Sequence, residues 1–599
     1  MDEYYTEYLD QIKDAVVNQS SLGRLSTWME QKTYLGGSKF SFKNHEFQID
    51  IVDSRHNNVV VIKPSQVGLT ECSIRLVLSF LAVESGTVAL HLLPTLGEAQ
   101  KATKSRFDPI IKGSPYLRSI VSAGSDSSSF KQIGDSQLFT GGTYGKSVIS
   151  IPTDLLSIDE CDFGNPENIA TSESRLTHSR FLDEETGARG LKRKWSTPTA
   201  VGIGVDALFA KSNQKRRLVR CKHCGHWFWP QFLKHVVVSG WDKPFTEMTH
   251  IDAAILNERG VLPTAKLLCE KCFKPITRDN LRHEYREWVA EFPTRTYQEG
   301  FHVNPLDLPD YHTPESILRK LMDYGNNTNH FYNFVLGLAY SDASNSIIDE
   351  LVAKYINVRP ITPEEAESGA ISGCIAGLDV GRTSWLLIGK PNYYNKTIDI
   401  VWAESIRLQG DEDDYLKMVV LNRLNQYGVV KLVCDAMPCT PTILSIQAGR
   451  PEGWVLPNFY VLRDKKLPLF QVVEKEHIIN SNRTKTLNLT AKRANSGVFR
   501  WPTLEIMGVV RKHLQGMKRI DREVDGEEVS EWVKSGEDHF FHAANYLSMA
   551  NDTIEQDYGE WNGYRSSRLN RQYRVIYQTN MDEVFVQVEK ITPDDYRRK

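Results

Sequence analysis

The segment from Val59 to Glu71, VVVIKPSQVGLTE, constrains the chain more than any other. An apolar run, a turn of small residues and then a helical segment form the pattern of a phosphate-binding loop. In such a loop backbone N–H groups, a lysine and a hydroxyl hold the phosphates and Mg²⁺ of a nucleotide. Gly68 and Thr70 occupy their positions in the usual GxxxxGK[ST] pattern, but Leu69 replaces the lysine and Lys63 replaces the first glycine. Because an ammonium is a point charge on a flexible stem, a lysine at the first position can still reach the same phosphates. An ordinary loop is the alternative interpretation. The residues predicted to bind ATP here are Lys63, Ser65, Gln66, Gly68, Leu69 and Thr70.

A second acidic segment follows about ninety residues later. Ser150 to Asp162, SIPTDLLSIDECD, is a short apolar run that closes in Asp159-Glu160, the form of a Walker B strand. In that form Asp159 holds the nucleotide Mg²⁺ through water, and Glu160 polarises the attacking water. A strand that ends in an acidic turn is the alternative. The two segments, followed by Ser196-Thr197-Pro198-Thr199 after Trp195, together predict an ATPase.

Length and composition limit the class of protein. A chain of 599 residues is too long for one core and predicts roughly two to four domains. It contains no run of about 18 apolar residues, and Met1 to Asn18 is acidic, so we expect neither a membrane span nor a secretory signal. The sequence predicts a cytoplasmic protein. Because the net charge is only −3, binding to nucleic acid must come from local basic patches.

The segments around the phosphate loop predict the rest of a nucleotide-binding domain. Residues 1–43 carry apolar side chains at helical spacing and predict an N-terminal arm, which packs on the core or docks a partner. Phe47-Gln48 is a candidate adenine pocket, because a glutamine can bond both edges of the base. Thr87 to Pro94 predicts a second buried strand, and strands alternating with helices predict a parallel sheet. Two arginines past the Walker B segment are candidates to act in trans on a neighbouring subunit's nucleotide, with a plain surface position as the alternative: Arg175 and Arg180.

Four of the nine cysteines form two CxxC pairs, Cys221 with Cys224 and Cys269 with Cys272. This usage indicates a reducing compartment and a metal rather than disulfides. Four thiolates in two knuckles suit tetrahedral Zn²⁺ with no open position, so we predict a structural zinc ribbon at about residues 218–280. The spacer of 44 residues exceeds the usual length of about 15–20, so an insertion around 241–263 is expected to loop out. Two nearby histidines are alternative ligands: His223 and His226.

A second set of carboxylates follows a polar, proline-bearing stretch at 346–371, which predicts a linker. Asp379 follows the apolar run from Ile371 to Leu378, within the string GLDVG, Asp435 ends a later strand, and Asp538 opens a late helix. Antiparallel strands that begin with GLDVG suggest a ribonuclease-H-like domain at 372–552. Three converging carboxylates would hold two Mg²⁺ or Mn²⁺, which clamp the attacking and leaving oxygens of a phosphodiester. The alternatives are a turn residue for Asp435 and a helix-capping role for Asp538.

The order of these motifs, from the shifted Walker A through DECD, STPT, the CxxC pairs, GLDVG, CDAMP and DHFFHAANY, resembles the large terminase subunit of tailed bacteriophages. The resemblance is to the lambda GpA-like type and covers about Phe42 to Asn551. It implies an α/β chain with a P-loop ATPase domain at 44–345 and a nuclease domain, ending in a basic tail at 553–599. It also implies that Lys63 is the Walker A lysine, that Ser196, Thr197 and Thr199 belong to a coupling motif, and that the catalytic acids are Glu160, Asp379, Asp435 and Asp538. The match is weaker in the nuclease, where Glu404 or His539 is an alternative ligand.

The same resemblance implies the partners and location of the chain. The expected activity is a DNA-packaging motor, in which ATP hydrolysis with Mg²⁺ drives double-stranded DNA through the portal of a procapsid and an endonuclease cuts concatemeric DNA. The expected partners are double-stranded DNA, a small terminase subunit, the portal protein and further copies of the chain in a ring, in the host cytoplasm and without a membrane. A helicase-nuclease is the alternative, and a non-catalytic scaffold would leave both acidic sites without a role.

Overall fold

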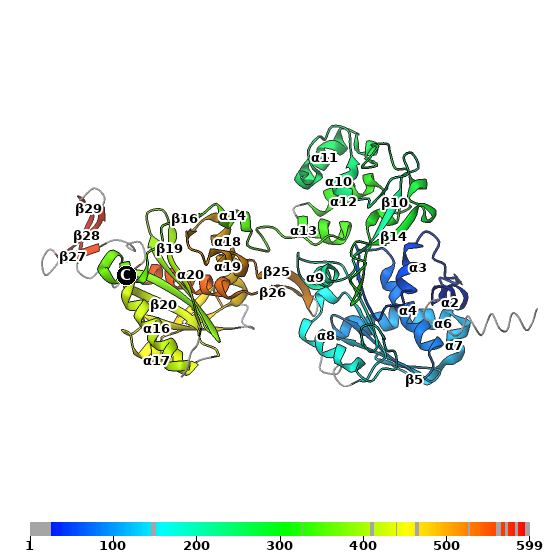
Figure 1. Ribbon diagram of the computed structural model, residues 1–599, viewed down its shortest axis with the longest axis horizontal. Helices are drawn as coiled ribbons and strands as arrows, with labels where there is room; N and C mark the ends of the chain where they lie inside the picture. Colours follow the sequence, from blue (N-terminus) through cyan, green and yellow to red (C-terminus); the bar gives the residue numbers. More distant parts are fainter. Residues whose placement is uncertain are drawn as a thin grey trace, which may run out of the picture. The chain divides into compact units, whose positions relative to one another are not determined.

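The structure is a computed structural model. It describes residues 25–144, 151–325, 327–407, 412–438, 440–461, 467–524, 527–558, 565–568, 573–580 and 585–593. The chain divides at Tyr340 and Ser341 into two units (Figure 1). The first contains Met1–Tyr340 and Arg522–Val529, and the second contains Ser341–Asp521 and Ser530–Lys599. Residues 1–24 of the predicted N-terminal arm lie outside the described residues, and its described part contains a helix, α2 (Leu25–Lys32). No helix in the described ranges is long and apolar enough to cross a membrane.

The first unit is built on an 11-stranded mixed sheet. Ten strands follow the order β11 (Trp227–Phe228), β10 (Lys215–Arg220), β15 (Glu299–His302), β3 (Asn58–Ile62), β9 (Leu191–Ser196), β8 (Leu155–Asp159), β4 (Val88–Leu93), β7 (Ser136–Gly142), β6 (Phe130–Ile133) and β5 (Val121–Asp126), while β14 (Arg286–Ala290) pairs with β10. The seven strands from β10 to β7 are parallel. The parallel sheet expected from alternating strands and helices is therefore present, with antiparallel strands at both edges.

Both faces of this sheet are covered, as its continuous apolar strands require. Val59 and Val61 of β3 pack in the core with α3 (Phe47–Val52) and α4 (Leu69–Val83). Val60 and Ile62 point to the other face, where α9 (Gly204–Lys211) packs. The remaining helices of this part are α5 (Leu96–Ala102), α6 (Asp108–Gly113), α7 (Pro115–Ile120) and α8 (Pro166–Glu173). Since β3, β9 and β8 are parallel, their carboxyl ends lie at one edge of the sheet.

The segment that contains the four CxxC cysteines has a small core of its own. Its elements are α10 (Phe232–His235), β12 (Val236–Val237), α11 (His250–Glu258), β13 (Lys266–Leu267), and, further along, α12 (Pro314–Tyr324) and α13 (Thr328–His330). The prediction that 241–263 loops out is wrong. Phe245, Met248, Ala253 and Leu256 are buried in this core with residues of α12, because the long spacer folds as a helical layer.

The second unit contains a nine-stranded mixed sheet. Its strand order is β16 (Ile356–Val358), β24 (Phe499–Pro502), β19 (Thr397–Arg407), β18 (Thr383–Asn392), β17 (Cys374–Asp379), β20 (Val429–Asp435), β21 (Val455–Tyr460), β23 (Ile478–Ser481) and β22 (Phe470–Val473). β17 is antiparallel to β18 and parallel to β20. The chain is therefore an α/β protein with two large mixed sheets.

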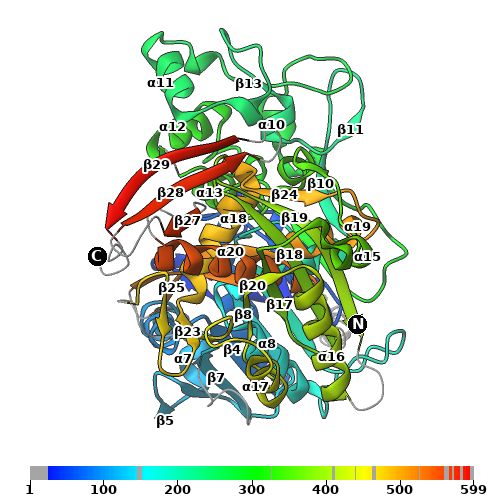
Figure 2. The ribbon, with the colours of Figure 1, turned by 90° about the vertical axis from the view of Figure 1, so that its left-hand side faces the viewer.

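Helices cover both faces of the second sheet. Helix α20 (His539–Tyr558) packs along β17, β18 and β20, as Figure 2 shows, together with α18 (Arg483–Ser496) and α19 (Met507–Leu514). The opposite face packs against α16 (Glu412–Gln426) and α17 (Thr440–Ala448). Successive residues of β17 alternate between the two cores, since Ile375 belongs to the α20 side and Ala376 to the α16 side. This alternation decides which side chains of the sheet can meet.

Three further segments differ from the sequence prediction or extend it. Residues 346–371, expected to be a linker, form α14 (Asp349–Ala353), β16 and α15 (Pro363–Glu365), and Ile347 and Val352 are buried in the core of the second unit. These two apolar side chains attach an otherwise polar segment to the core of the second unit. A hairpin, β25 (Met517–Val524) and β26 (Glu527–Lys534), precedes α20. The basic tail contains a three-stranded antiparallel sheet of β27 (Arg565–Arg568), β28 (Tyr573–Asn580) and β29 (Phe585–Pro593).

Candidate functional sites

The phosphate loop connects β3 to α4, as its sequence predicts. Gly68 precedes α4 with φ at 77°, a left-handed conformation that favours glycine. Leu69 follows as the first residue of the helix, and its side chain is 1% exposed in the core. A lysine at position 69 would bury its ammonium there. The structure thus gives a physical reason why the cation of this loop sits elsewhere.

Lys63 supplies that cation from the carboxyl end of β3. Its ammonium donates to Glu160 Oε1 at 2.6 Å and to Thr70 Oγ1 at 3.3 Å, and it lies 3.2 Å from Asp159 Oδ1. One side chain therefore contacts the loop hydroxyl and both acids of the Walker B segment. The three parallel strands that end at this edge bring these residues together, although β9 lies between β3 and β8 in the sheet.

The charges at this edge stabilise one another. Burial alone would lower the pKa of Lys63, but Asp159 and Glu160 raise it above its ordinary value. Burial would likewise raise the pKa of Asp159, yet the nearby Lys63 ammonium lowers it. Lys63 is thus held as an ammonium and Asp159 as a carboxylate. Such a pair of fixed charges is suited to a triphosphate and to a divalent cation.

Glu160 joins this cluster to the STPT segment. It has φ at 52°, an uncommon conformation for a residue with a side chain and one that often marks a functional position. Its Oε2 accepts a hydrogen bond from the Thr197 backbone N–H at 3.2 Å and from Ser196 Oγ at 3.4 Å. The predicted catalytic acid therefore touches both Lys63 and the first two residues of the predicted coupling motif.

Asp162 is a buried residue of this region to which the sequence analysis assigned no role. Its Oδ2 accepts hydrogen bonds from the backbone N–H and the hydroxyl of Thr199, at 3.1 and 3.0 Å, and its Oδ1 accepts one from Val205 N–H at 2.6 Å. Burial raises the pKa of Asp162 to about 7 in spite of these donors. Its position in the acidic DECD string was the only available signal. Asp162 connects the end of the Walker B segment to Thr199 and to α9.

The predicted adenine pocket takes a different form. Phe47 is completely buried in the core, so its ring is not open to a base in this structure, and binding of adenine at this segment stays a prediction. Gln48 is also buried, and its Nε2 donates to the carbonyl oxygen of Val67 at 2.9 Å. A Cβ on Gly68 would lie 3.1 Å from the same nitrogen. Gln48 therefore holds the phosphate loop in place through its hydrogen bond to Val67.

The two candidate trans arginines lie away from this cluster. Arg180 is exposed and donates to Glu84 Oε2 and to the Ser85 carbonyl, both at 3.2 Å. The Arg175 carbonyl accepts a hydrogen bond from Thr153 N–H, just before β8 begins. Both arginines therefore lie toward the amino ends of the parallel strands, opposite the phosphate loop. A role in trans stays a prediction for both.

The four cysteines converge as the two CxxC pairs predict. Their sulfur atoms all lie within 4.8 Å of one another, and across the knuckles Cys221 and Cys272 are 3.8 Å apart and Cys224 and Cys269 are 3.7 Å apart. Sulfurs bound to one tetrahedral Zn²⁺ at about 2.3 Å are separated by about 3.8 Å, whereas a disulfide is about 2.0 Å long. The four thiols fit a zinc ion. His226, weighed as an alternative ligand, has its Nε2 2.9 Å from Glu270 Oε1.

In the second unit, Asp379 and Asp435 end neighbouring parallel strands. β17 and β20 pair through Leu378 and Cys434, one residue before each aspartate, so the two carboxylates lie level and on the same face. Asp379 is 7% exposed. Burial, and then the negative charge of Asp379, raise the pKa of Asp435 to about 6. The sheet therefore places two predicted metal ligands side by side.

Asp538 reaches this region from the start of α20 but is held by other partners. Burial would raise the pKa of Asp538, but hydrogen bonds from His542 and from Lys534, whose Nζ lies 2.7 Å away, lower it. His539 Nδ1 lies 2.8 Å from Asp379 Oδ2, and this hydrogen bond raises the pKa of His539. The three carboxylates do not all lie within 4.8 Å of one another; of the residues that the structure describes, the four cysteines form such a group. His539 thus contacts a predicted ligand, while convergence of all three acids stays a prediction.

Glu404 lies on the opposite face of the sheet. In the register of β17, β18 and β19, Glu404 is level with Leu386 and Leu378, which face α16, whereas Asp379 is level with Trp385. Glu404 accepts a hydrogen bond from Arg423 Nε of α16 at 2.9 Å. Because neighbouring residues of a strand point to opposite faces, Glu404 cannot join Asp379.

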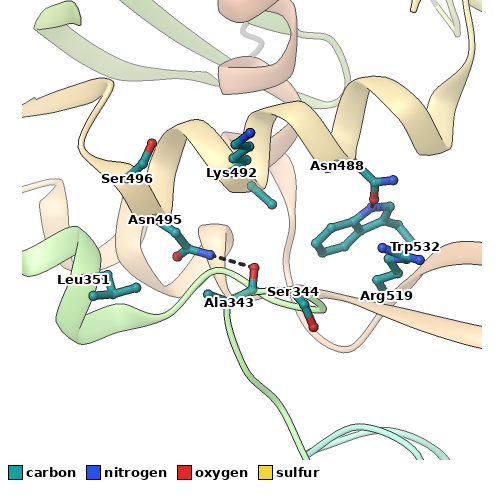
Figure 3. Close-up of a pocket in the computed structure, with 10 residues that line it drawn as sticks. Ala343, Ser344, Leu351, Asn488, Lys492, Asn495, Ser496, Arg519 and Trp532 are labelled. Atoms are coloured by element: carbon teal, nitrogen blue, oxygen red, sulfur yellow. Dashed lines mark hydrogen bonds between the residues drawn. The ribbon is translucent and has the colours of Figure 1, made fainter. Parts of the chain in front are cut away.

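A hollow of ≈ 420 Å³ in the second unit is separate from these carboxylates (Figure 3). It is lined by α18, by Ala343 and Ser344 and by Trp532, and none of the predicted nuclease residues lines it. Asn495 points across it and donates to the Ala343 carbonyl at 3.3 Å. Asn488 accepts a hydrogen bond from Trp532 Nε1 at 2.8 Å. Its polar lining is thus partly used to attach residues 343–344 to α18.

Comparison with known proteins matches this chain to phage terminases. Residues 44–288 match the model of the family described as phage terminase large subunit gpA, ATPase domain. Among solved structures, the large terminase of bacteriophage HK97 is 11% identical, with a TM-score of 0.48, over 88% of this chain and 99% of that chain. The large terminase ATPase domain of Thermus phage P74-26 is 12% identical with a TM-score of 0.28, over 51% of this chain and 100% of that chain. The large terminase nuclease of thermophilic phage G20c is 14% identical with a TM-score of 0.23, over 34% of this chain and 98% of that chain.

No curated protein matches the chain. The family match spans β3, the phosphate loop, the Walker B strand β8, the STPT segment and all four cysteines. Residues 44–288 are therefore similar to the ATPase domain of the phage terminase large subunit gpA.

Proposed function

We propose that this chain is the motor and nuclease subunit of a viral DNA-packaging machine. Hydrolysis of ATP in the first unit drives double-stranded DNA through the portal into a procapsid, and the second unit cuts concatemeric DNA. The observation that carries the proposal is the contact of Lys63 with Thr70, Asp159 and Glu160. It supports a complete nucleotide site despite the missing lysine at position 69.

Each residue of this site has a distinct role in the proposal. Lys63 neutralises the β and γ phosphates, and Thr70 and Asp159 hold the Mg²⁺ that enters with ATP. Glu160 accepts a proton from, and orients, the attacking water. Because Glu160 also accepts hydrogen bonds from Ser196 and Thr197, any movement of Glu160 during hydrolysis is passed to the STPT segment. That connection supports a coupling role for Ser196, Thr197 and Thr199.

In the second unit we assign the cleavage of DNA to Asp379, Asp435 and Asp538, on a ribonuclease-H-like domain. Carboxylate oxygens are the ligands that Mg²⁺ and Mn²⁺ prefer, and these residues lie on adjacent strand ends and at the start of α20. Divalent cations held there supply electrostatic stabilisation of the attacking and leaving oxygens. His539 holds Asp379 in place through its hydrogen bond.

The same proposal places the chain in the host cytoplasm and transiently at the portal vertex. Its partners are the small terminase subunit, the portal protein and other copies of the chain in a ring, in which Arg175 or Arg180 acts on a neighbour's nucleotide. A triplex-displacement assay tests the motor directly. We expect ATP-dependent release of a third strand from intact duplex DNA and no unwinding of a forked duplex. Unwinding of the fork with no triplex displacement would instead establish a helicase-nuclease.

We further propose one structural Zn²⁺ in the ribbon, bound by Cys221, Cys224, Cys269 and Cys272. We expect about one zinc per purified chain, because the four thiols fit a closed tetrahedral site. Cys221→Ser and Cys272→Ser should each lose the metal and lower the melting temperature, since structural zinc is coupled to folding. The matched control is His223→Ala, which changes an exposed knuckle residue and should keep the metal. Protein that has never met a chelator and contains no zinc would contradict the assignment.

A further inference from the structure

The two cysteine knuckles have the same backbone hydrogen bonds. In the first, Cys221 N–H donates to the His226 carbonyl at 2.9 Å, and Gly225 N–H donates to the Cys221 carbonyl at 2.8 Å. In the second, Cys269 N–H donates to the Lys274 carbonyl and Phe273 N–H to the Cys269 carbonyl, both at 3.0 Å. Gly225 and Phe273 therefore occupy equivalent positions, one residue after the last cysteine of each knuckle.

This position requires a left-handed backbone. The φ angle is 71° at Gly225 and 56° at Phe273. Glycine adopts such angles freely, whereas a bulky side chain there is sterically unfavourable. The first knuckle has the residue that its geometry favours, and the second has an aromatic residue in its place.

The phenylalanine does not stabilise the ribbon by packing. Its side chain is 71% exposed, and it is absent from the buried core that contains Phe245 and Leu256. Phe273 therefore destabilises the folded chain in two ways, through its backbone angle and through its exposed apolar surface. Strain that persists without a benefit to the fold is a sign of function.

The charges around Phe273 are positive. Lys271 and Lys274 flank it, and both are exposed. Glu270 is the nearest acid in sequence, but its oxygens lie 2.9 Å from Nε2 of His226 in the first knuckle and 3.3 Å from Nε2 of His235 in α10. Two exposed ammonium groups and an aromatic ring therefore stand together at the tip of the second knuckle.

We propose that this knuckle tip, defined as Lys271, Phe273 and Lys274, binds DNA. The lysines contact backbone phosphates, and the ring of Phe273 contacts a base or sugar. Lysine is depleted at protein–protein interfaces, where arginine is enriched, so a tip with two lysines and no arginine favours nucleic acid over an acidic protein. The inference rests on the proposed function, which supplies DNA as the substrate, and adds a contact outside both the ATPase and the nuclease residues.

The test compares DNA affinity of the full zinc-containing chain in buffer without Mg²⁺ and without chelator, so that DNA stays intact. The probes are closed circular duplex, blunt linear duplex and single-stranded DNA. Phe273→Gly should weaken binding to at least one form about five-fold or more, the lower range for loss of an aromatic contact with a base. Its zinc content should stay unchanged, and its melting temperature should be equal or higher, because glycine suits the backbone angle.

Two further variants define the contact. Lys271→Ala with Lys274→Ala should reduce the salt dependence of log K by about 2, since each phosphate contact contributes about 0.9. Tyr394→Gly is the matched control, because Tyr394 is 86% exposed in the second unit and should leave affinity unchanged. The form of DNA that responds to Phe273→Gly shows whether the ring meets a groove, an end or a single strand.

Unchanged affinity of both knuckle variants for all three DNA forms overturns the proposal, and it is the result expected if the tip serves an acidic protein instead. A wild-type chain that binds none of the DNA forms would contradict the proposed function itself. The two failures are therefore distinguishable.

Discussion

The two acidic sites of the molecule are assembled in different ways. In the first unit a single ammonium, that of Lys63, contacts Asp159, Glu160 and Thr70. In the second unit each acid has its own partner. Asp379 is bonded to His539, and Asp538 to Lys534.

The difference shows how a chain can position like charges. Two carboxylates repel each other strongly when they are close and partly buried, so an opposite charge must hold them. The ATPase site carries that charge within the protein, on a lysine that also serves the nucleotide. Of the proposed nuclease acids, Asp379 and Asp435 share a sheet edge, while Asp538 lies at the start of α20. In the proposed function, bound divalent cations supply the opposite charge that these acids need. The first site should therefore be sensitive to loss of one lysine, and the second to loss of any one acid.

Lys63→Ala should have the largest effect. Removing one preorganised group that stabilises the transition state reduces turnover by about 10²–10³-fold. It also leaves the buried Asp159 carboxylate without its partner, at a cost of about 3–5 kcal/mol in the free energy of unfolding. Steady-state ATP hydrolysis and chemical denaturation measure the two effects.

The control for this variant is Lys39→Ala, which removes an exposed lysine and should change neither quantity. Adding Leu69→Lys to Lys63→Ala should not rescue hydrolysis, because position 69 faces the core. Wild-type turnover in Lys63→Ala would contradict the assignment of this lysine.

Asp379→Asn and Asp435→Asn come next and should affect the other unit. Each keeps the shape of the side chain but removes one charge, so the affinity for divalent cations should fall and plasmid cleavage should drop by about 100-fold. Additional Mn²⁺ should restore part of it. ATP hydrolysis should remain near the wild-type rate, because its residues lie in the first unit. If hydrolysis falls together with cleavage, the division of activities between the two units is wrong.

Asp162→Asn should have a smaller effect and extends the comparison beyond Lys63. Both oxygens of Asp162 accept hydrogen bonds, so one backbone donor, at Thr199 or Val205, would face an amide N–H₂. An unsatisfied buried donor costs about 1–3 kcal/mol. We expect a loss of that size in the free energy of unfolding and slower ATP hydrolysis. The matched control is Asp206→Asn, where one oxygen accepts from Gly202 N–H and an amide oxygen can replace it.

Local sequence was sufficient where short motifs mark each part of a site. The strand, turn and helix around Lys63 and the two CxxC pairs were recognisable because the residues that matter lie a few positions apart. Contacts between distant segments that carry no such motif could not be predicted from the sequence. The burial of Phe47 by helix α3 is one such contact. The segment 241–263 was expected outside the ribbon, but its apolar side chains make a core with α12. No local pattern indicates that β9 lies between β3 and β8, because strand order is decided by packing of the whole sheet.

Glu404→Gln should have the smallest effect, and it tests whether the sheet or the motif decides which acids belong to the nuclease. From the sequence alone Glu404 is a candidate ligand, since it lies on a strand that neighbours the GLDVG strand. The register of β17, β18 and β19 places Glu404 on the face of the sheet opposite Asp379. Glu404 is level with Leu378, one residue before Asp379, and it points toward Arg423 on the α16 side. Removing its charge weakens a partly exposed ion pair that is worth about 1 kcal/mol or less. Plasmid cleavage and its dependence on Mn²⁺ should therefore match the wild type within error, while Asp379→Asn in the same assay loses cleavage. A loss of cleavage in Glu404→Gln comparable to that in Asp379→Asn would mean that both side chains share one face, which the pairing of β17, β18 and β19 does not allow.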